Sequence, residues 1–292
     1  MSTQIDYLCT PSAMQFSHAL TAGNISNVVV AFQHHIYGYY KSFGRIFTWR
    51  QTTNPYHIVV SEIMLQQTQT YRVQGKFEHF IELFPDFYHL AQAPMRDLLA
   101  AWQGLGYNRR ALALQAIAKR VVTEFGGFLP DDPAVLETFP GIGPNTAGSI
   151  GAFAFNKPTV FVETNIRSVF IHFFFSEQRL VHDKMLLPLV AKMLDTHNPR
   201  AWYYALMDYG VALKKMYPNP SRKSVHHARQ SKFEGSDRQL RGAILRLLTT
   251  KNHVSYPELQ HIEKDFERLA RIVQDLVKDG FITSDGSIIT LK

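Results

Sequence analysis

Residues 137–155 read Glu137-Thr-Phe-Pro-Gly-Ile-Gly-Pro-Asn-Thr-Ala-Gly-Ser-Ile-Gly-Ala-Phe-Ala-Phe155. Within this stretch, Pro140-Gly141-Ile142-Gly143 lies between two apolar segments with helical spacing. The two glycines allow the positive backbone angles of a tight turn. They also let a phosphate approach the N–H groups that begin the next helix, where the helix dipole favours an anion. The pattern predicts a phosphate-binding turn between two helices; the alternative is an ordinary connection in a helical protein.

Two glutamates outside the turn favour the first interpretation. Glu163 follows an apolar run, and we expect Asn165 and Arg167 to hold its carboxylate ionised by hydrogen bonding and charge pairing. The alternative is that Glu163 only caps the next helix. Glu62 stands in an otherwise apolar helical stretch before Gln66-Gln67-Thr68-Gln69, and its alternative is a solvated helix face. Two carboxyl groups in dissimilar settings, one protonated and one ionised, are what cleavage of a glycosidic bond requires, including the bond to a nucleobase.

The composition fits a globular chain with a polyanionic partner. With 292 residues and 46% hydrophobic content, the chain can bury a sizeable core, as two domains. Its net charge is +7, and residues 214–251 alone carry ten Lys and Arg against Glu234 and Asp237. This concentrated positive charge predicts contact with a nucleic-acid backbone.

The single cysteine, Cys9, excludes an intramolecular disulfide and a thiolate metal or iron–sulfur site. The first residues lack the basic, apolar and small-residue pattern of a signal peptide. We also find no apolar stretch of roughly 20 residues that would span a membrane. The histidines have no convincing metal spacing, so we predict no metal site. We expect a cytoplasmic protein, associated with the nucleoid if the source is bacterial.

The periodicity predicts a mainly α-helical chain. A helical pattern runs from Tyr56 to Phe84 and is stopped by Pro85. Further helices are expected over 94–102, 111–125, 164–175, 183–196 and 200–213. Three helices over about 236–250, 256–262 and 265–279 precede a hairpin with an Asp285-Gly286 turn, which is the outline of a winged helix. We therefore predict a core over 1–213, a basic linker over 214–235 and a small winged-helix-like α+β domain over 236–292.

The order of several motifs adds a resemblance to this outline. Ser61-Glu62 with Leu65–Gln69, Gly104–Tyr107, Phe139–Gly143 with Thr146–Gly148, and Met207–Gly210 occur in that order over about residues 45–212. Together they resemble the adenine DNA glycosylase branch of the helix-hairpin-helix base-excision superfamily. The resemblance implies a two-lobed helical core that grips DNA by the hairpin and rotates one nucleotide out of the duplex.

The resemblance also implies roles for individual residues. Glu62 matches the general acid that protonates the adenine ring, and Glu163 falls where the family has an aspartate that stabilises the sugar cation. Gln67 matches the residue that fills the gap in the base stack, and Tyr107 lies in a loop that contacts or wedges the duplex. Further DNA contacts are predicted at Gly141, Gly143, Thr146, Arg167, Lys214, Lys215, Arg222 and Lys223.

The sequence departs from the family pattern in three places. Glu163 is one methylene longer than the family aspartate. Asn145 stands where bifunctional relatives carry a lysine, and an amide cannot form a Schiff base, so we predict base removal without strand cleavage. The four cysteines that usually follow the Met207–Gly210 motif are replaced by the basic segment from Lys214, so we predict that the iron–sulfur cluster is absent.

The sequence thus predicts a monomeric, monofunctional DNA glycosylase that acts on duplex DNA carrying a mispaired or damaged base. A mispaired adenine, in some duplexes opposite 8-oxoguanine, is the expected substrate. The usual C-terminal nucleotide-hydrolase-like domain is not found, which leaves the opposite base open. Two alternatives remain: a glycosylase for uracil, mismatched thymine or a deaminated or alkylated purine, and a DNA-binding lesion reader without catalysis.

Overall fold

A computed structural model of the chain describes residues 16, 25–227 and 232–292. The described residues form two compact units, and each unit is built from stretches that are distant in sequence. The first contains the described residues up to Thr53 together with 131–137 and those of 142–229; the second contains 54–130, 138–141 and those of 230–292. The stretch predicted as one core, 1–213, therefore contributes to both units, and the winged-helix-like segment belongs to the second.

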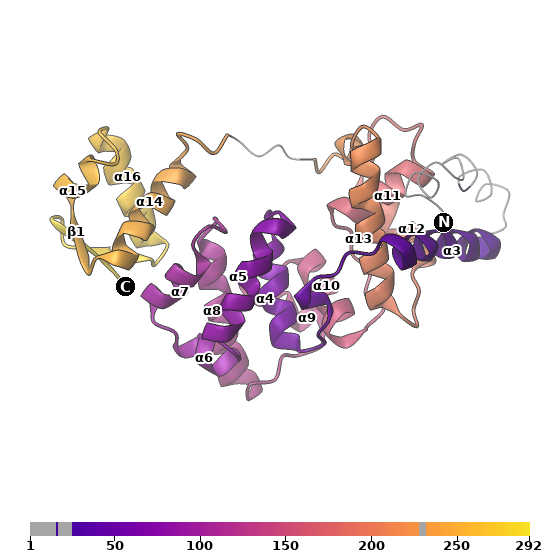
Figure 1. Cartoon of the computed structure of the whole chain (residues 1–292), viewed down its shortest axis with the longest axis horizontal. Helices are drawn as coiled ribbons and strands as arrows, with labels where there is room; N and C mark the ends of the chain where they lie inside the picture. The colour runs from indigo at the N-terminus through magenta and orange to yellow at the C-terminus, as the bar shows by residue number, and fades with distance from the viewer. Residues whose placement is uncertain (1–15, 17–24, 228–231) are drawn as a thin grey trace. The chain divides into compact units, whose positions relative to one another are not determined.

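The first unit is a helical bundle around an aromatic core. Helix α13 packs against both α11 and α3, and α11 and α13 run side by side in Figure 1. Phe32, Phe173 and Trp202 are buried. The ring centroids of Phe173 and Trp202 lie 5.5 and 5.8 Å from the ring centroid of Phe32. Phe174 is buried in the same core. The described elements are α3 (Ile25–Phe43), η1 (Thr48–Arg50), α9 (Pro133–Leu136), α10 (Pro144–Phe155), α11 (Thr164–Phe174), α12 (Asp183–Met193), α13 (Pro199–Met216) and η2 (Pro220–Lys223).

The second unit begins with five helices: α4 (Pro55–Leu65), α5 (Thr70–Leu83), α6 (Phe87–Gln92), α7 (Met95–Trp102) and α8 (Arg109–Phe125). The predicted continuous helix from Tyr56 to Phe84 is wrong, because the chain breaks between α4 and α5. At the break, Gln67 has φ 53°, a left-handed conformation that ends a right-handed helix. The break was not predicted, because apolar residues with helical spacing lie on both sides of it.

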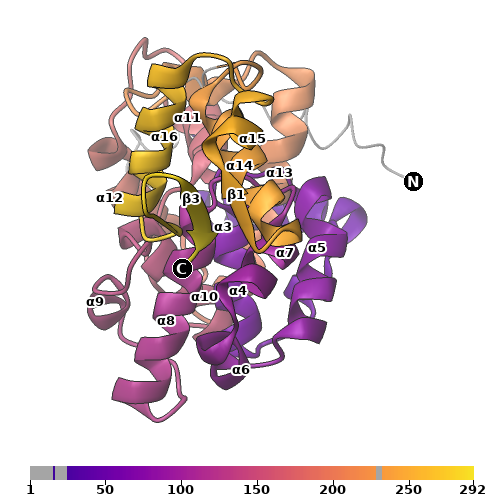
Figure 2. The same cartoon turned by 90° about the vertical axis from the view of Figure 1, so that its left-hand side faces the viewer.

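The C-terminal segment of the second unit has the predicted winged-helix outline. It comprises α14 (Asp237–Thr250), β1 (His253–Ser255), α15 (Tyr256–Gln260), α16 (Phe266–Lys278), β2 (Ile282–Ser284) and β3 (Ile288–Leu291). The predicted hairpin is confirmed, with Thr283 opposite Thr290. The three-stranded antiparallel sheet has the order β1-β3-β2, and Figure 2 shows β1 and β3 beside the three helices. Strand β1 was not predicted, because three residues are too short for a periodic signal.

The winged segment is packed into the second unit through α7 and α8. Leu99 of α7 belongs to the same buried apolar cluster as Ile244 and Leu276 of the winged segment. Polar contacts add to this core: an Arg96 guanidinium N–H donates to the carbonyl of Thr249 at 3.0 Å, and the Gln103 amide donates to the Thr249 hydroxyl at 2.8 Å. The segment is therefore part of a shared hydrophobic core.

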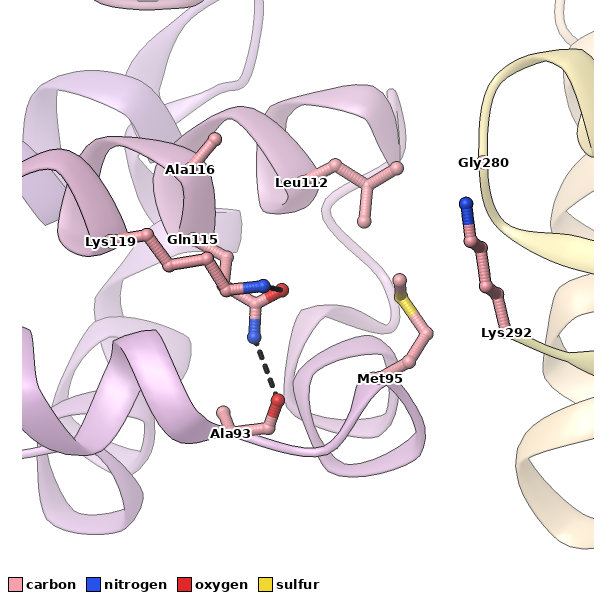
Figure 3. A pocket seen from close by; sticks show the side chains of 8 residues that line it. All are labelled: Ala93, Met95, Leu112, Gln115, Ala116, Lys119, Gly280 and Lys292. Carbon is pink, nitrogen blue, oxygen red and sulfur yellow. Dashed lines mark hydrogen bonds between the residues drawn. The ribbon is translucent and has the colours of Figure 1, made fainter.

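A hollow of about 430 Å³ lies at this junction, and Figure 3 shows its lining. Gln115 spans one wall and donates from its amide nitrogen to the Ala93 carbonyl at 2.7 Å. None of the residues predicted to act on DNA lines this hollow. It is consequently not the predicted site.

Candidate active site and nucleic-acid interface

The hairpin turn connects α9 to α10 through two glycines that differ in conformation. Gly141 has φ 76°, and a Cβ there would stand 3.1 Å from that of Ala113. Gly143 is extended, with φ −101° and ψ −179°, so of the two glycines only Gly141 uses the positive backbone angle that both allow. The reason is that Gly143 is the N-cap of α10, a position that takes extended backbone. Pro144 occupies the first helical position, and no side chain caps this helix end. An uncapped helix start beside glycines is suited to an anion.

Asn145 connects the start of α10 to the segment that carries Glu163. Its side-chain carbonyl accepts the N–H of Val162 at 3.1 Å. Farther along α10, Gly148 and Gly151 allow this segment to lie close, since a Cβ at either would come within 2.9 Å of Phe161 or Thr159. The position at which bifunctional relatives carry a lysine is thus occupied here by an amide that holds the backbone next to Glu163.

Glu163 is the N-cap of α11, and both of its carboxylate oxygens accept hydrogen bonds. Oε1 accepts the main-chain N–H groups of Asn165 and Ile166 at 2.7 and 2.9 Å, and Oε2 accepts the side-chain amide of Asn165 at 3.0 Å. The side chain remains partly exposed. Hydrogen bonds to an ionised carboxylate at a helix N-terminus hold it in one orientation. The expected contact with Asn165 is confirmed, and Glu163 also caps α11; its catalytic role stays a prediction.

Arg167 does not pair with Glu163, and that expectation is wrong. Its guanidinium forms a bidentate pair with Asp183, with nitrogen–oxygen distances of 2.8 and 2.7 Å, and also donates to the Val162 carbonyl at 3.3 Å. Arg167 lies on the buried face of α11, at 9% exposure, which turns it away from the carboxylate four residues earlier. Its predicted contact with DNA stays a prediction, against which this ion pair argues.

The Met207–Gly210 motif holds the first unit together around a buried carboxylate. Asp208 is 2% exposed and accepts from both Arg45 and Arg50, whose guanidinium N–H groups lie 2.8–3.0 Å from its oxygens. Two positions on, Gly210 permits α13 to approach α11, because a Cβ there would collide with the main-chain carbonyl of Asn165. The motif therefore places α13 directly against the residues that hold Glu163.

Glu62 lies in the last turn of α4, in the second unit. Its neighbours Ser61, Ile63 and Met64 are buried, whereas Glu62 itself is partly exposed. Beyond the helix end, the Gln66 amide donates to the carbonyl of Gly141 at 3.0 Å, and Gln67 is exposed in its left-handed conformation. The Gln-rich motif thus contacts the hairpin turn, and the place of Gln67 in a base stack stays a prediction. That Glu62 and Glu163 meet at one nucleoside stays a prediction, because they belong to different units.

Arg110 organises this region, and the sequence reasoning missed it. One terminal nitrogen donates to the carbonyls of Ile63 and Met64 at 2.9 and 2.8 Å, and the other donates to the carbonyls of Leu105 and Gly106 at 3.1 and 3.0 Å. Burial lowers the pKa of Arg110 to about 10. The signal in the sequence was an arginine on the apolar face of a helix directly after a glycine turn. Its guanidinium joins the end of α4 to the Gly104–Tyr107 loop.

Tyr107 ends that loop in a left-handed conformation, with φ 48°. Its ring lies under two guanidinium groups, Arg110 at 5.6 Å and Arg238 at 5.5 Å from the ring centroid. Arg238, from the first turn of α14, also donates to the Tyr107 hydroxyl at 2.7 Å. The winged segment therefore contacts the loop that is predicted to touch DNA, which no sequence motif indicated.

The predicted basic linker begins inside a helix. Lys214 and Lys215 belong to the last turn of α13, and they point differently: Lys215 is exposed, whereas Lys214 is half-buried and donates to the side-chain carbonyl of Asn165. Arg222 is exposed and Lys223 donates to the Ser176 carbonyl at 2.5 Å. The phosphate contacts predicted for Lys215 and Arg222 stay predictions, and the contact of Lys214 with Asn165 argues against one there.

The residues after Met207–Gly210 do not fit an iron–sulfur cluster. A cluster of the family type needs four thiolates, and the chain has one cysteine, Cys9, which lies outside the described residues. Instead, Pro220, Ser221 and Ser224 are buried where this segment packs on α11, and Ser224 forms a β-bridge with Val181. Within the described ranges, no group of three His, Cys, Asp or Glu side chains is placed to hold a metal ion. No described helix is long and apolar enough to cross a membrane.

Comparison with known proteins agrees with this geometry. A profile of the family described as "HhH-GPD superfamily base excision DNA repair protein" matches residues 60–189. The adenine DNA glycosylase of Mycolicibacterium smegmatis is 30% identical over 270 residues, which cover 85% of this chain and 92% of that one. The adenine DNA glycosylase of Buchnera aphidicola subsp. Baizongia pistaciae is 34% identical over 186 residues, covering 63% of this chain and about half, 53%, of the relative. Among solved structures, a thermostable thymine-DNA glycosylase is 24% identical with a TM-score of 0.58, and covers 62% of this chain and 85% of that one. This structural likeness shows a shared fold.

Proposed function

The chain belongs to the HhH-GPD superfamily of base excision DNA repair proteins, and from this premise we propose that it is a monofunctional DNA glycosylase that releases mispaired adenine from duplex DNA. The observation that carries the proposal is the Glu163 carboxylate, held by three N–H donors directly after the hairpin helix α10. The relatives named adenine DNA glycosylase support adenine as the base.

The proposed reaction divides the work between two carboxyl groups. The Glu62 carboxylic acid donates a proton to the extruded adenine, and the bond between C1′ and the base nitrogen breaks with its electron pair going to the base. The sugar is left as an oxocarbenium-like cation, which the ionised Glu163 carboxylate stabilises. Water then adds to C1′ and loses a proton, so that the products are free adenine and an abasic site.

Asn145 supports hydrolysis without strand cleavage. Its amide accepts the Val162 N–H and has no amine to attack C1′, so no Schiff base forms at this position. We expect borohydride to trap no covalent complex with an abasic duplex. Strand breaks should appear only after the released product is treated with alkali.

The hairpin and the exposed cations support DNA binding. Gly141, Gly143 and the uncapped start of α10 suit a backbone phosphate. Exposed Lys215 and Arg222 add positive charge, and neutralising phosphates with such residues releases counterions. The affinity for duplex DNA should therefore fall steeply with salt, and Lys215→Ala should reduce the log–log salt slope by about 1.

The decisive experiment is a panel of labelled duplexes that differ in a single base pair. Adenine opposite guanine, 8-oxoguanine or cytosine should be released, whereas uracil, mismatched thymine and hypoxanthine serve as competing substrates. Glu62→Gln and Glu163→Gln should bind the adenine duplex and release nothing. Exposed glutamates of each unit, Glu82 and Glu177, provide the matched Gln controls. Release of another base in preference to adenine would identify that base as the substrate. Binding without any abasic product would favour the alternative of a DNA-binding lesion reader.

A further inference from the structure

Helix α13 presents one face to the residues that hold Glu163. Gly210 marks the closest approach, because a Cβ at this position would collide with the main-chain carbonyl of Asn165. Residues four apart on a helix lie on the same face, so Lys214 follows Gly210 on the side that faces α11. The backbone contact at Gly210 consequently brings the Lys214 side chain within reach of Asn165.

Lys214 uses this reach for a side-chain hydrogen bond. Its ammonium group donates to the side-chain carbonyl oxygen of Asn165. Burial lowers the pKa of Lys214, the nearby negative charge of Glu163 opposes that shift, and Arg45 adds to it. A half-buried lysine is costly to desolvate and is retained only with a good partner.

The contact with Lys214 determines which way the Asn165 amide faces. A lysine has only donors, so it selects the carbonyl oxygen of the amide and leaves the NH₂ group on the other side. That NH₂ group donates to Oε2 of Glu163 at 3.0 Å. If the amide were reversed, its carbonyl oxygen would face the carboxylate, and the two oxygens would repel each other.

We propose that Lys214 is a positioning residue for base release, which fixes the Asn165 amide and through it the orientation of the Glu163 carboxylate. The inference rests on the proposed function for its catalytic consequence. Main-chain N–H groups hold Oε1, and the Lys214–Asn165 pair holds Oε2, so the carboxylate loses its freedom to rotate. Its negative charge is thereby aimed in one direction before the sugar cation forms.

The matched pair of variants is Lys214→Met and Lys192→Met. Methionine keeps the length and the apolar stem but removes the charge and the donors, and Lys192 is an exposed lysine of α12 in the same unit. We expect Lys214→Met to lower the single-turnover rate of base release roughly 10- to 100-fold, with DNA affinity unchanged. Lys192→Met should leave the rate unchanged, and Lys214→Arg should recover part of the loss because arginine also has only donors.

A double variant tests whether the effect passes through Asn165. Asn165→Ala should reduce the rate by at least as much as Lys214→Met, and adding Lys214→Met to it should cause no further loss. Equal rates for Lys214→Met and the wild type would overturn the proposal. So would a fall in DNA affinity that accounts for the whole loss, because Lys214 would then be a phosphate contact.

A measurement on the free protein separates this inference from the proposed function. In urea, Lys214→Met should shift the unfolding midpoint of the wild type and shift that of Asn165→Ala by less than half as much. This coupling is expected even if no duplex releases a base, in which case the proposed function fails and the positioning contact stands. Equal shifts in both backgrounds would show that the two side chains do not interact.

Discussion

The two acids of the proposed reaction occupy opposite ends of their helices. Glu163 caps the start of α11, where main-chain and side-chain N–H groups bind both of its oxygens. Glu62 lies in the last turn of α4, at the carbonyl end, among buried neighbours. The two carboxyl groups therefore have dissimilar surroundings, as the two roles in the proposed reaction require.

Removing either carboxyl group should have the largest effect. Glu62→Gln and Glu163→Gln are each expected to slow single-turnover base release by about 10³-fold or more. The reasons differ: the first variant loses the proton donor, and the second loses the charge opposite the sugar cation. Quench-flow measurement of abasic product at saturating enzyme gives both rates. Near-normal base release by either variant would show that the substituted carboxyl group does not have the proposed catalytic role.

The contacts that hold the end of α4 near Glu62 should contribute strongly to the stability of the protein. Arg110→Met removes the guanidinium that donates to the carbonyls of Ile63, Met64, Leu105 and Gly106, so we expect it to reduce the free energy of unfolding by about 3 kcal/mol or more. Arg109→Met, which removes an exposed arginine paired with Asp279, should cost about 1 kcal/mol or less. Urea unfolding compares the two. A similar cost for both would mean that Arg110 does not hold the loop and the helix end together.

Shortening the Glu163 side chain to aspartate should slow base release less than removing its charge. Aspartate is a good N-cap and keeps the charge, so Glu163→Asp should stay within about 10-fold of the wild-type rate. A loss as large as that of Glu163→Gln would show that the longer side chain is required by the distance to the sugar. The measurement is the same single-turnover assay, with DNA affinity as the control.

The smallest effect is expected at the contact between Tyr107 and the winged segment. Tyr107→Phe removes the hydrogen bond to Arg238, worth about 1 kcal/mol, or roughly five-fold in DNA affinity if the loop must be held for binding. Arg238→Ala removes the same hydrogen bond together with the guanidinium over the Tyr107 ring. Combining them should weaken binding no further than the stronger single change. Arg246→Ala, an exposed arginine of the same helix, is the control. Additive losses would show that Tyr107 and Arg238 act separately.

Local signals in the sequence predicted several parts of the candidate site and few of the contacts that hold them in place. The Pro140–Gly143 turn, the acid at Glu163 with Asn165, and the winged outline all depend on neighbouring residues, and the structure contains them. The break at Gln67 was missed because helical apolar periodicity lies on both sides of the polar run 66–70, and a left-handed backbone leaves no mark in periodicity. The contacts of Arg110 with Thr68, Lys214 with Asn165 and Arg238 with Tyr107 were missed, because these partners lie 42, 49 and 131 residues away in the sequence.

Leu99 has one further consequence for the polypeptide as a whole. It is buried among the side chains of α14 and α16, so the α7 helix is completed by residues that arrive more than a hundred positions later. During synthesis, this apolar cluster stays incomplete until residues 240–289 have left the ribosome. Until then, the apolar side chains of Met95, Leu99 and Leu112 are exposed and can bind chaperones. A protease that cuts the folded protein near Gly235 should yield two fragments that elute together.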